Sequence, residues 1–297
     1  MAQRKIGIIG GTGLGDVLIK EAGGRPVETE TPFGPPSIDP IEANWEGVDV
    51  VFLARHGQGH RFNPTTIPYR ANIWALKKLG VSAIIASGAT GSLREDFEPG
   101  QLVLCDQVID RTVRRPSTFF DEGLVAHVEF GDPFCPALRK LLTRAGDDID
   151  AMVHHAGTYV CMEGPQFSTR AESLMHRQWG GDLIGMTCMP EAKLAREAEI
   201  CYALIAFPTD YDCWRPVDPG RPHEALLNEI LGNLRRATDN AVTLIRQTLK
   251  RWTELETGCR CRQALEMAIW SDSTKVDPDA LERLDLLIGQ RFADHTG

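Results

Sequence analysis

The sequence predicts an α/β protein in which a mostly parallel sheet is flanked by helices and followed by a helical C-terminal appendage. Three observations support this prediction. Short apolar runs alternate with amphipathic stretches from residue 5 to residue 207. Several of these runs stop abruptly at Gly, Ser, Arg or Asp, where a buried strand would end. After residue 223, apolar residues recur with helical spacing.

The expected elements follow one another in alternation. Strands are expected over residues 5–10, 48–54, 81–86, 101–110, 157–163, 182–189 and 201–207. Helices are expected over residues 69–80, 134–145, 169–179, 191–199 and 223 to about 257, with two more stretches between 263 and 292. Loops of small residues are expected at 11–16 and 87–92. No internal repeat or long linker is visible, so a single domain is the simplest interpretation.

Composition narrows the classes of function. With 297 residues, 42% of them hydrophobic and 25% charged, the chain has the make-up of an ordinary globular protein. Its net charge of −9 argues against a surface that binds nucleic acid. No apolar run approaches the roughly 20 residues that a membrane span needs. The first predicted strand begins within a few residues of Met1, so we expect a cytoplasmic protein without a signal peptide.

Small donors, cations and carboxylates follow the predicted strands. They are Thr12, Arg55, His56, Ser87 to Ala89, Met186, Thr187, Asp210 and Asp212. A mostly parallel sheet would bring these strand ends to one edge, where ligands bind in open α/β folds. Hydroxyls, backbone N–H groups, a guanidinium and an imidazole donor suit an anion such as phosphate. The carboxylates, some distance away, suit a nitrogen-rich group that accepts a proton.

Asp210 and Asp212 stand two residues apart at the end of an apolar run. In an extended chain both side chains point the same way, so together they could perform acid–base chemistry or bind donors on a ligand. The alternative is a solvated turn, because Asp is common where strands end.

The eight cysteines suggest a reduced, cytosolic protein, because several of them (Cys161, Cys188 and Cys201) lie inside apolar runs. Cys259 and Cys261 form a Cys-x-Cys pair, which fits a disulfide or half of a metal site. No second Cys/His pair of zinc-finger spacing lies near them in the sequence, so no metal is expected.

Ten short segments, in order along the chain, resemble one family. They are Gly10–Leu14, Thr31–Gly34, Ala54–Gly57, Asn72–Leu76, Gly91–Glu95, Asp106–Gln107, Asp110–Thr112, Glu163–Phe167, Arg170–Ser173 and Thr209–Trp214. Together they are similar to the trimeric purine nucleoside phosphorylase family, and within it to the methylthioadenosine phosphorylases. The resemblance covers about residues 5–250.

The resemblance implies a mixed, mostly parallel sheet of the phosphorylase type. Residues 1–250 would form the nucleoside phosphorylase domain. Residues 251–297 would form a helical extension packed on that domain or on a neighbouring subunit. It further implies a cytoplasmic pentosyltransferase of purine and methionine salvage, assembled as a homotrimer or as a hexamer of two trimers. The implied reaction is reversible phosphorolysis of 5′-methylthioadenosine to adenine and 5-methylthioribose 1-phosphate. Phosphate would be a co-substrate, with no cofactor and no metal.

The resemblance also assigns roles to residues. Asp210 would donate a proton or strong hydrogen bond to N7 of the leaving purine, which requires a raised pKa in a dry pocket. Asp212 would accept from the 6-amino group. The implied phosphate-binding residues are Thr12, Arg55, His56, Gly88, Ala89 and Thr187, and the implied sugar contacts are Ala89 and Met186. Family members often carry Thr or Ser at the position of Gly88, so this chain lacks one hydroxyl donor there.

Specificity rests on three positions. Relatives that use 6-oxopurines resemble this chain but carry Asn in place of Asp210 and Glu in place of Ser168, so this chain is expected to prefer adenine. His223 looks like the histidine of relatives that accept a 5′-hydroxyl, with which an imidazole can hydrogen-bond. Adenosine or another 5′-hydroxyl purine nucleoside is therefore an alternative substrate to 5′-methylthioadenosine.

Two other classes of protein remain open. A dinucleotide-dependent oxidoreductase would need the Gly-x-Gly-x-x-Gly register, whereas the glycines here fall at 10, 11, 13 and 15. A non-catalytic nucleoside-binding protein would keep Asp210 and Asp212 but show no phosphate-dependent turnover. A metal-linked role for Cys259 and Cys261 is a weaker possibility, open to metal analysis.

Overall fold

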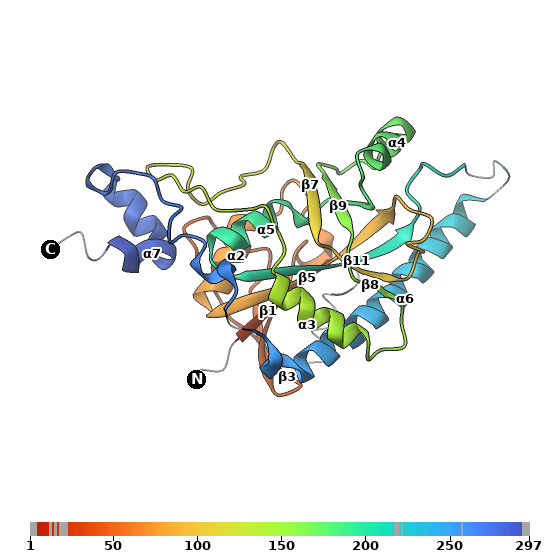
Figure 1. The fold of residues 1–297 in the computed structure, drawn as a ribbon, viewed down its shortest axis with the longest axis horizontal. Helices are drawn as coiled ribbons and strands as arrows, with labels where there is room; N and C mark the ends of the chain where they lie inside the picture. The colour runs from red at the N-terminus through yellow and green to blue at the C-terminus, as the bar shows by residue number, and fades with distance from the viewer. Residues whose placement is uncertain are drawn as a thin grey trace.

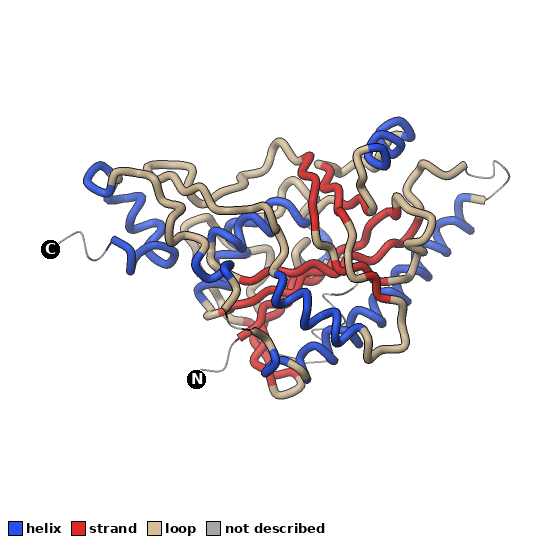
Figure 2. Tube along the Cα trace, viewed as in Figure 1, coloured by secondary structure: helices blue, strands red, loops and turns tan. Residues whose placement is uncertain are grey.

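The computed structural model of the chain describes residues 5–11, 14, 17, 23–216, 220, 222–256 and 258–292, without the side chains of residues 223, 273, 290 and 292. A mixed 11-stranded sheet runs through the described part, with helices on both of its faces (Figure 1). Figure 2 shows the strands gathered in the middle of the molecule and the helices around them. The predicted α/β fold with a mostly parallel sheet is therefore confirmed.

The strands are β1 (Lys5–Gly10), β2 (Arg25–Pro26), β3 (Ile41–Trp45), β4 (Val48–Ala54), β5 (Val81–Ser92), β6 (Leu102–Leu104), β7 (Gln107–Arg111), β8 (Val153–His154), β9 (Thr158–Met162), β10 (Leu183–Gly185) and β11 (Cys201–Asp210). The α-helices are α2 (Tyr69–Lys78), α3 (Pro136–Gly146), α4 (Arg170–Gln178), α5 (Cys188–Glu197), α6 (His223–Lys250) and α7 (Pro278–Phe292). Short 3₁₀ turns are η1 (Gln58–His60), η2 (Trp252–Glu254), η3 (Arg260–Gln263) and η4 (Ser273–Lys275).

β5 is the central strand of the sheet. It pairs in parallel with β1 and with β11, and β1 pairs in parallel with β4. The far end of β5 pairs with β10 in the antiparallel sense, which makes the sheet mixed. Successive residues of β5 pack into different cores: Ile84 faces the core that includes α2 and α5, and Ile85 faces the core that includes α3 and α6. This alternation is the pattern expected of a strand that is buried on both faces.

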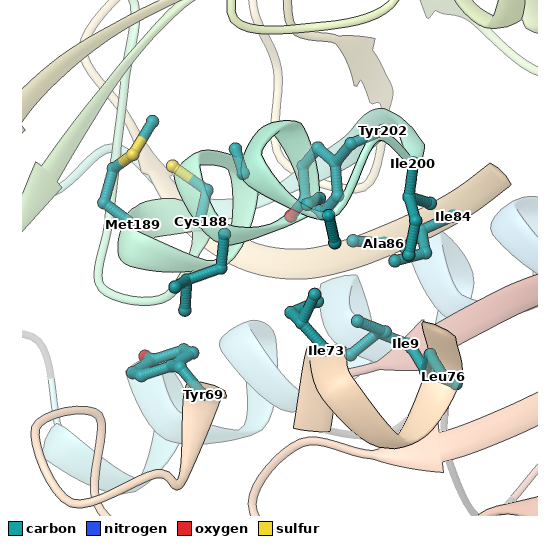
Figure 3. Close-up of a cluster of buried hydrophobic side chains, with 14 of the residues drawn as sticks. Ile9, Tyr69, Ile73, Leu76, Ile84, Ala86, Cys188, Met189, Ile200 and Tyr202 are labelled. Carbon is teal, nitrogen blue, oxygen red and sulfur yellow. The ribbon is translucent and has the colours of Figure 1, made fainter. Parts of the chain in front are cut away.

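The core beneath α2 and α5 holds the site loops in place. Figure 3 shows Ile73 and Leu76 of α2 across from Ile84 of β5 and Tyr202 of β11. All four side chains are at most 2% exposed. Because such cores are packed to the density of organic crystals, the strand ends above them are fixed in position rather than free to drift.

Three predicted boundaries were wrong for physical reasons. The run 87–92 was expected as a loop, but β5 continues to Ser92, because β11 satisfies its backbone groups as far as the pair Asp210–Gly91. The predicted strand 101–110 divides into β6 and β7, which pair with different neighbours. Of the predicted strand 182–189 only β10 is extended, since Cys188 already begins α5.

The C-terminal segment adds helical structure to the same molecule. α6 ends at Lys250, earlier than the predicted 257, and α7 follows after a stretch of 3₁₀ turns. Leu284, Leu287 and Ile288 of α7 belong to the core that α2 and α5 also line. α7 lies at the opposite end of the molecule from α4 (Figure 1). Among the described helices, none combines the length and the apolar character needed to cross a bilayer.

Candidate active site

The predicted site residues lie on or beside β5, which runs from an end rich in hydrogen-bond donors to an acidic end. Ser87 and Gly88 stand opposite Ile205 and Ala206 of β11, and Asp210 stands opposite Gly91 after a shift of register that follows Pro208. Ser87 and Gly91 are four positions apart in an extended chain, which corresponds to about 13 Å. The two ends of the site are therefore far enough apart to bind different groups.

Ser87, inside β5, lies where the ends of β1 and β4 meet. Its hydroxyl accepts from the backbone N–H of Gly11 at 3.3 Å, and its carbonyl oxygen accepts from Nη1 of Arg55 at 2.8 Å. A Cβ at position 11 would stand 2.9 Å from that carbonyl oxygen, closer than real Cβ contacts allow. Gly11 is therefore required for the ends of β1 and β4 to approach Ser87 of β5.

Arg55 is fully buried and is held by Glu191 of α5. Nε and Nη2 donate to the two carboxylate oxygens, each at 2.7 Å, and the Tyr202 hydroxyl donates to Oε1 of Glu191 at 2.8 Å. Burial opposes the charge, but Glu191 raises the pKa of Arg55 above its ordinary value. A guanidinium has five N–H groups, so one on each terminal nitrogen is left for a ligand.

His56 is buried beside Arg55 and stacks on His60, with ring centroids 4.0 Å apart. Its Nδ1 lies 2.9 Å from the carbonyl oxygen of Phe62, which can only accept, so Nδ1 carries the proton. Burial lowers the pKa of His56 to about 4, with the charges of Arg55 and His60 adding to the effect. In the neutral ring Nε2 is an acceptor, whereas the sequence interpretation had treated this imidazole as a donor to phosphate.

Thr187 and Gly88 face each other at the same end. A Cβ at position 88 would stand 3.6 Å from Oγ1 of Thr187. Thr187 precedes α5, but its side chain makes no capping bond to the helix, so the hydroxyl is not used there. Thr187 can therefore supply the hydroxyl that Gly88 lacks.

At the other end of β5, Asp210 is held in a defined orientation. Oδ2 accepts from the hydroxyl of Thr209 at 2.8 Å, and Oδ1 accepts from the backbone N–H of Asp212 at 2.7 Å. Burial raises the pKa of Asp210, the Asp212 charge adds to this, and the two hydrogen bonds oppose it. The balance favours the protonated acid more than in an exposed Asp, as a proton donor requires.

Asp212 has an unpartnered acceptor. Its Oδ2 is buried without a hydrogen-bond partner among the described residues. The backbone at Asp212 has φ of +48°, a conformation that is uncommon for a residue other than Gly and that clusters at functional sites. A buried carboxylate oxygen without a donor carries a free-energy cost, which a donor on a ligand would remove.

Ser168 and Met186 line the same region from other elements. The carbonyl oxygen of Ser168 accepts from Sγ of Cys213 at 3.2 Å, which ties the turn before α4 to the segment after Asp212. Met186 lies between β10 and Thr187, and its carbonyl oxygen accepts from Arg115 at 2.6 Å. Thr12 lies outside the described residues, and so does the side chain of His223, which begins α6.

Sequence reasoning missed the residues that brace the site. Arg115 is 7% exposed and donates to Oε1 of Glu163 at 3.0 Å, to the hydroxyl of Tyr69 at 3.2 Å and to Met186. Against the effect of burial, hydrogen bonds from Val113 and other donors lower the pKa of Glu163 to about 2. Neither Arg115 nor Glu191 was predicted as a site residue, because their partners Glu163 and Arg55 are distant in the sequence.

Comparisons with known proteins agree with this geometry. A family model described as the Phosphorylase superfamily matches residues 5–250. The S-methyl-5′-thioadenosine phosphorylase of Geobacter sulfurreducens is 47% identical over 97% of this chain and 99% of its own. That of Thermosynechococcus vestitus is 49% identical over 96% of this chain and 98% of its own.

Solved structures are similar over the same extent. A methylthioadenosine phosphorylase from an Antarctic soil metagenomic library superposes with a TM-score of 0.88 at 44% identity, covering 97% of this chain and 99% of that chain. The Schistosoma mansoni methylthioadenosine phosphorylase in complex with tubercidin gives a TM-score of 0.78 at 35% identity, covering 89% of this chain and 96% of that chain. A variant of the S. mansoni adenosine/methylthioadenosine phosphorylase in complex with methylthioadenosine gives 0.76 at 34% identity, covering 97% and 98%.

Proposed function

The chain belongs to the Phosphorylase superfamily, and we propose that it is a pentosyltransferase that converts 5′-methylthioadenosine and phosphate reversibly to adenine and 5-methylthioribose 1-phosphate. The observation that carries the proposal is the order of groups along β5. Ser87, with Arg55 beside it, stands at one end, and Asp210 stands opposite Gly91 at the other. An oxyanion nucleophile and a leaving purine would thus occupy opposite ends of one strand.

The chemistry follows from these positions. A phosphate oxygen forms a bond to C1′ while the bond from C1′ to N9 breaks, and positive charge develops on the sugar between them. Phosphate attacks C1′ and also stabilises the positive charge on the sugar, so its position assists both bond formation and charge stabilisation. Asp210 donates its proton to N7, and the adenine leaves as a neutral molecule. Over one cycle the proton that ends on adenine comes from monohydrogen phosphate, so the reaction needs no outside acid.

His56 is suited to the proton-bearing oxygen of phosphate. Its neutral ring leaves Nε2 as an acceptor, because Nδ1 donates to Phe62. The remaining N–H groups of Arg55, the hydroxyl of Thr187 and, by family resemblance, Thr12 would bind the other oxygens, with the backbone of Gly88 and Ala89 beside them. Monohydrogen phosphate has both donors and acceptors, and this set contains partners for each.

Adenine is the base that fits the acidic end. The unpartnered Oδ2 of Asp212 can accept from a 6-amino group, whereas it would face a 6-oxo group as one acceptor against another. Ser168, which lies near the segment after Asp212, leaves room and adds no second carboxylate. We therefore assign adenine nucleosides in preference to inosine.

The 5′-hydroxyl substrate adenosine is the second candidate. His223 at the start of α6 favours it by resemblance, and the S. mansoni relatives named adenosine/methylthioadenosine phosphorylases include both substrates in their name. Curated relatives that are 46–49% identical to this chain carry the name S-methyl-5′-thioadenosine phosphorylase, which supports 5′-methylthioadenosine as the first candidate.

We further propose a cytoplasmic homotrimer, or two trimers joined as a hexamer, that uses no cofactor in its reaction. Val113 and Phe167 are each 84% exposed; the backbone of Val113 donates to Glu163 at 2.6 Å, and Phe167 precedes Ser168. Apolar side chains exposed beside a site are typical of a subunit contact. A neighbouring subunit on this surface would cover the adenine end and exclude water from it.

A phosphorolysis assay tests the proposal. Adenine release is measured from 5′-methylthioadenosine, adenosine and inosine, each with and without phosphate. We expect phosphate-dependent release that is fastest with 5′-methylthioadenosine and slowest with inosine. Binding of nucleosides without turnover would instead indicate a non-catalytic binding protein. A change in nicotinamide fluorescence on adding NADH would revive the oxidoreductase alternative.

A further inference from the structure

Four cysteines from three separate parts of the chain gather at one point. The Sγ atoms of Cys135, Cys201, Cys259 and Cys261 all lie within 4.8 Å of one another. The Sγ atoms of Cys201 and Cys259 are 3.1 Å apart. None of the four is part of the candidate active site. No metal was predicted from the sequence, because no second Cys/His pair lies close to Cys259 and Cys261, whereas Cys135 and Cys201 come from distant elements.

The fold presents these thiols from rigid positions. Cys135 precedes α3 and Cys201 begins β11, and the two elements are joined by the backbone N–H of Cys135, which donates to Tyr202 at 2.8 Å. Cys259 and Cys261 lie at the start of η3. Cys135, Cys201 and Cys261 are at most 3% exposed, and Cys259 is half-buried. The four thiols therefore have limited access to solvent, but an ion can still reach them.

The spacing fits a tetrahedral site. Zinc bound by four thiolates has Zn–S distances of about 2.3 Å, so the sulfur atoms stand about 3.8 Å apart. Separations of 3.1 Å and of no more than 4.8 Å lie on either side of that value. Small rotations about the Cα–Cβ bonds would bring the four sulfur atoms to separations of about 3.8 Å. Structural zinc sites use four protein ligands and leave no open position, and four thiols meet that requirement.

A half-buried cation, Arg262, follows the cluster in the sequence. Nε and Nη2 of Arg262, the residue after Cys261, are buried without a hydrogen-bond partner among the described residues. Four thiolates around Zn²⁺ carry a net charge of about −2, and each thiol releases its proton to solvent as it binds. A half-buried guanidinium beside such a cluster offsets part of that charge and gains acceptors for its two unbonded nitrogens.

We propose that Cys135, Cys201, Cys259 and Cys261 bind one structural Zn²⁺ ion that fastens the C-terminal segment to the sheet. The segment is also attached by the apolar side chains of α7 that pack in the core and by polar contacts, such as the isolated bridge between Ala126 and Ile269. The backbone N–H of Leu265 also donates to Oε1 of Glu199 at 3.0 Å. A zinc ion would connect the start of η3 directly to β11 and α3. It would be remote from the chemistry and would act on stability.

Metal analysis of the full-length protein tests this proposal. The chain is purified under reducing conditions without chelators, and zinc is measured by mass spectrometry before and after addition of a mercurial thiol reagent. We expect about one zinc per chain, released as the reagent consumes the thiols. Denaturation with a chelator should then leave all eight cysteines open to alkylation.

Variants connect the ion to the cluster. Cys259→Ser and Cys261→Ser should each lose most of the zinc and lower Tm, and the chelator should lower the Tm of the wild type but not that of the double variant. Cys105→Ala, a buried cysteine outside the cluster, is the matched control and should keep its zinc. Wild-type protein with no bound zinc after growth in zinc-supplemented medium would overturn the proposal. So would unreduced protein in which the four cysteines resist alkylation as disulfides.

Discussion

Arg55 and Glu191 form a two-pronged ion pair, with both carboxylate oxygens 2.7 Å from guanidinium nitrogens and both side chains at most 1% exposed. The pair joins the end of β4 to the first turns of α5, 136 residues further along the chain. It fixes the guanidinium beside Ser87, so the proposed phosphate end is already built before any ligand binds. Preorganisation of this kind spares the cost of ordering the site during reaction.

Removing one partner of this pair should destabilise the fold. In Glu191→Gln the guanidinium stays buried with its charge no longer matched, so we expect the free energy of unfolding to fall by about 3–5 kcal/mol. Denaturant unfolding measures the change. Glu256→Gln, which removes the partner of Lys140 in an exposed ion pair, is the control and should have little effect. Equal losses in the two variants would contradict the structural role of the buried pair.

Changing Arg55 should chiefly impair the use of phosphate. Arg55→Lys keeps a positive charge but cannot bond to Glu191, Ser87 and a ligand at once. We expect KM for phosphate to rise about tenfold or more, which corresponds to about 1.4 kcal/mol, with a smaller change in KM for the nucleoside. Initial rates over a grid of both substrates measure the two constants. An unaltered phosphate dependence would count against Arg55 as a phosphate residue.

Asp210→Asn should lower turnover of adenine nucleosides by roughly 10²- to 10⁴-fold, because an amide cannot deliver a proton to N7. The turnover of 6-oxopurine nucleosides should rise relative to the turnover of adenine nucleosides. In the wild type, burial raises the pKa of Asp210, so the active acid form is present below that pKa and the rate should fall as pH rises through it. The pH profile of the variant should lack this decline. Identical profiles would refute the assignment.

His223→Val tests the 5′ position. If His223 lines the pocket, its loss should shift preference from adenosine toward 5′-methylthioadenosine, because an apolar side chain suits the thioether and cannot bond the hydroxyl. The ratio of kcat/KM for the two nucleosides is the quantity to compare. A ratio that does not move would place His223 outside the pocket.

A buried carboxyl away from the site predicts a pH dependence of stability. Burial raises the pKa of Glu197 to about 7, against the hydrogen bonds from Phe119 and Thr118. Its contribution is therefore fully present below the ordinary pKa of about 4.5 and is lost as pH rises toward 7. The linkage corresponds to about 3 kcal/mol over that range. Denaturant unfolding across pH should show a decline in the wild type that is reduced in Glu197→Gln, and parallel curves would contradict this account.

The sequence predicted those features that depend on neighbouring residues. The apolar run before Gly10, the helical spacing of Tyr69–Lys78 and the acidic end of β11 are local patterns, and each was found where expected. The extension of β5 was missed, because a run of Ser, Gly, Ala and Thr is loop-like until β11 pairs with it.

Partners distant in the chain also left no local trace. Glu191 is the partner of Arg55, Arg115 braces Met186, and Cys135 and Cys201 complete the cysteine cluster. Each of these contacts exists only after the sheet has formed. The local sequence around each residue describes an ordinary helix, loop or strand end.

The proposed mechanism depends most directly on which ligand binds at which end of β5. A crystal structure of the protein with adenine and phosphate, both soaked at moderate concentration, measures this. We predict N7 of adenine within hydrogen-bond distance of Asp210, and phosphate beside Ser87, Thr187 and Arg55. Phosphate bound against Asp210, or adenine bound beside Arg55, would contradict the proposed arrangement.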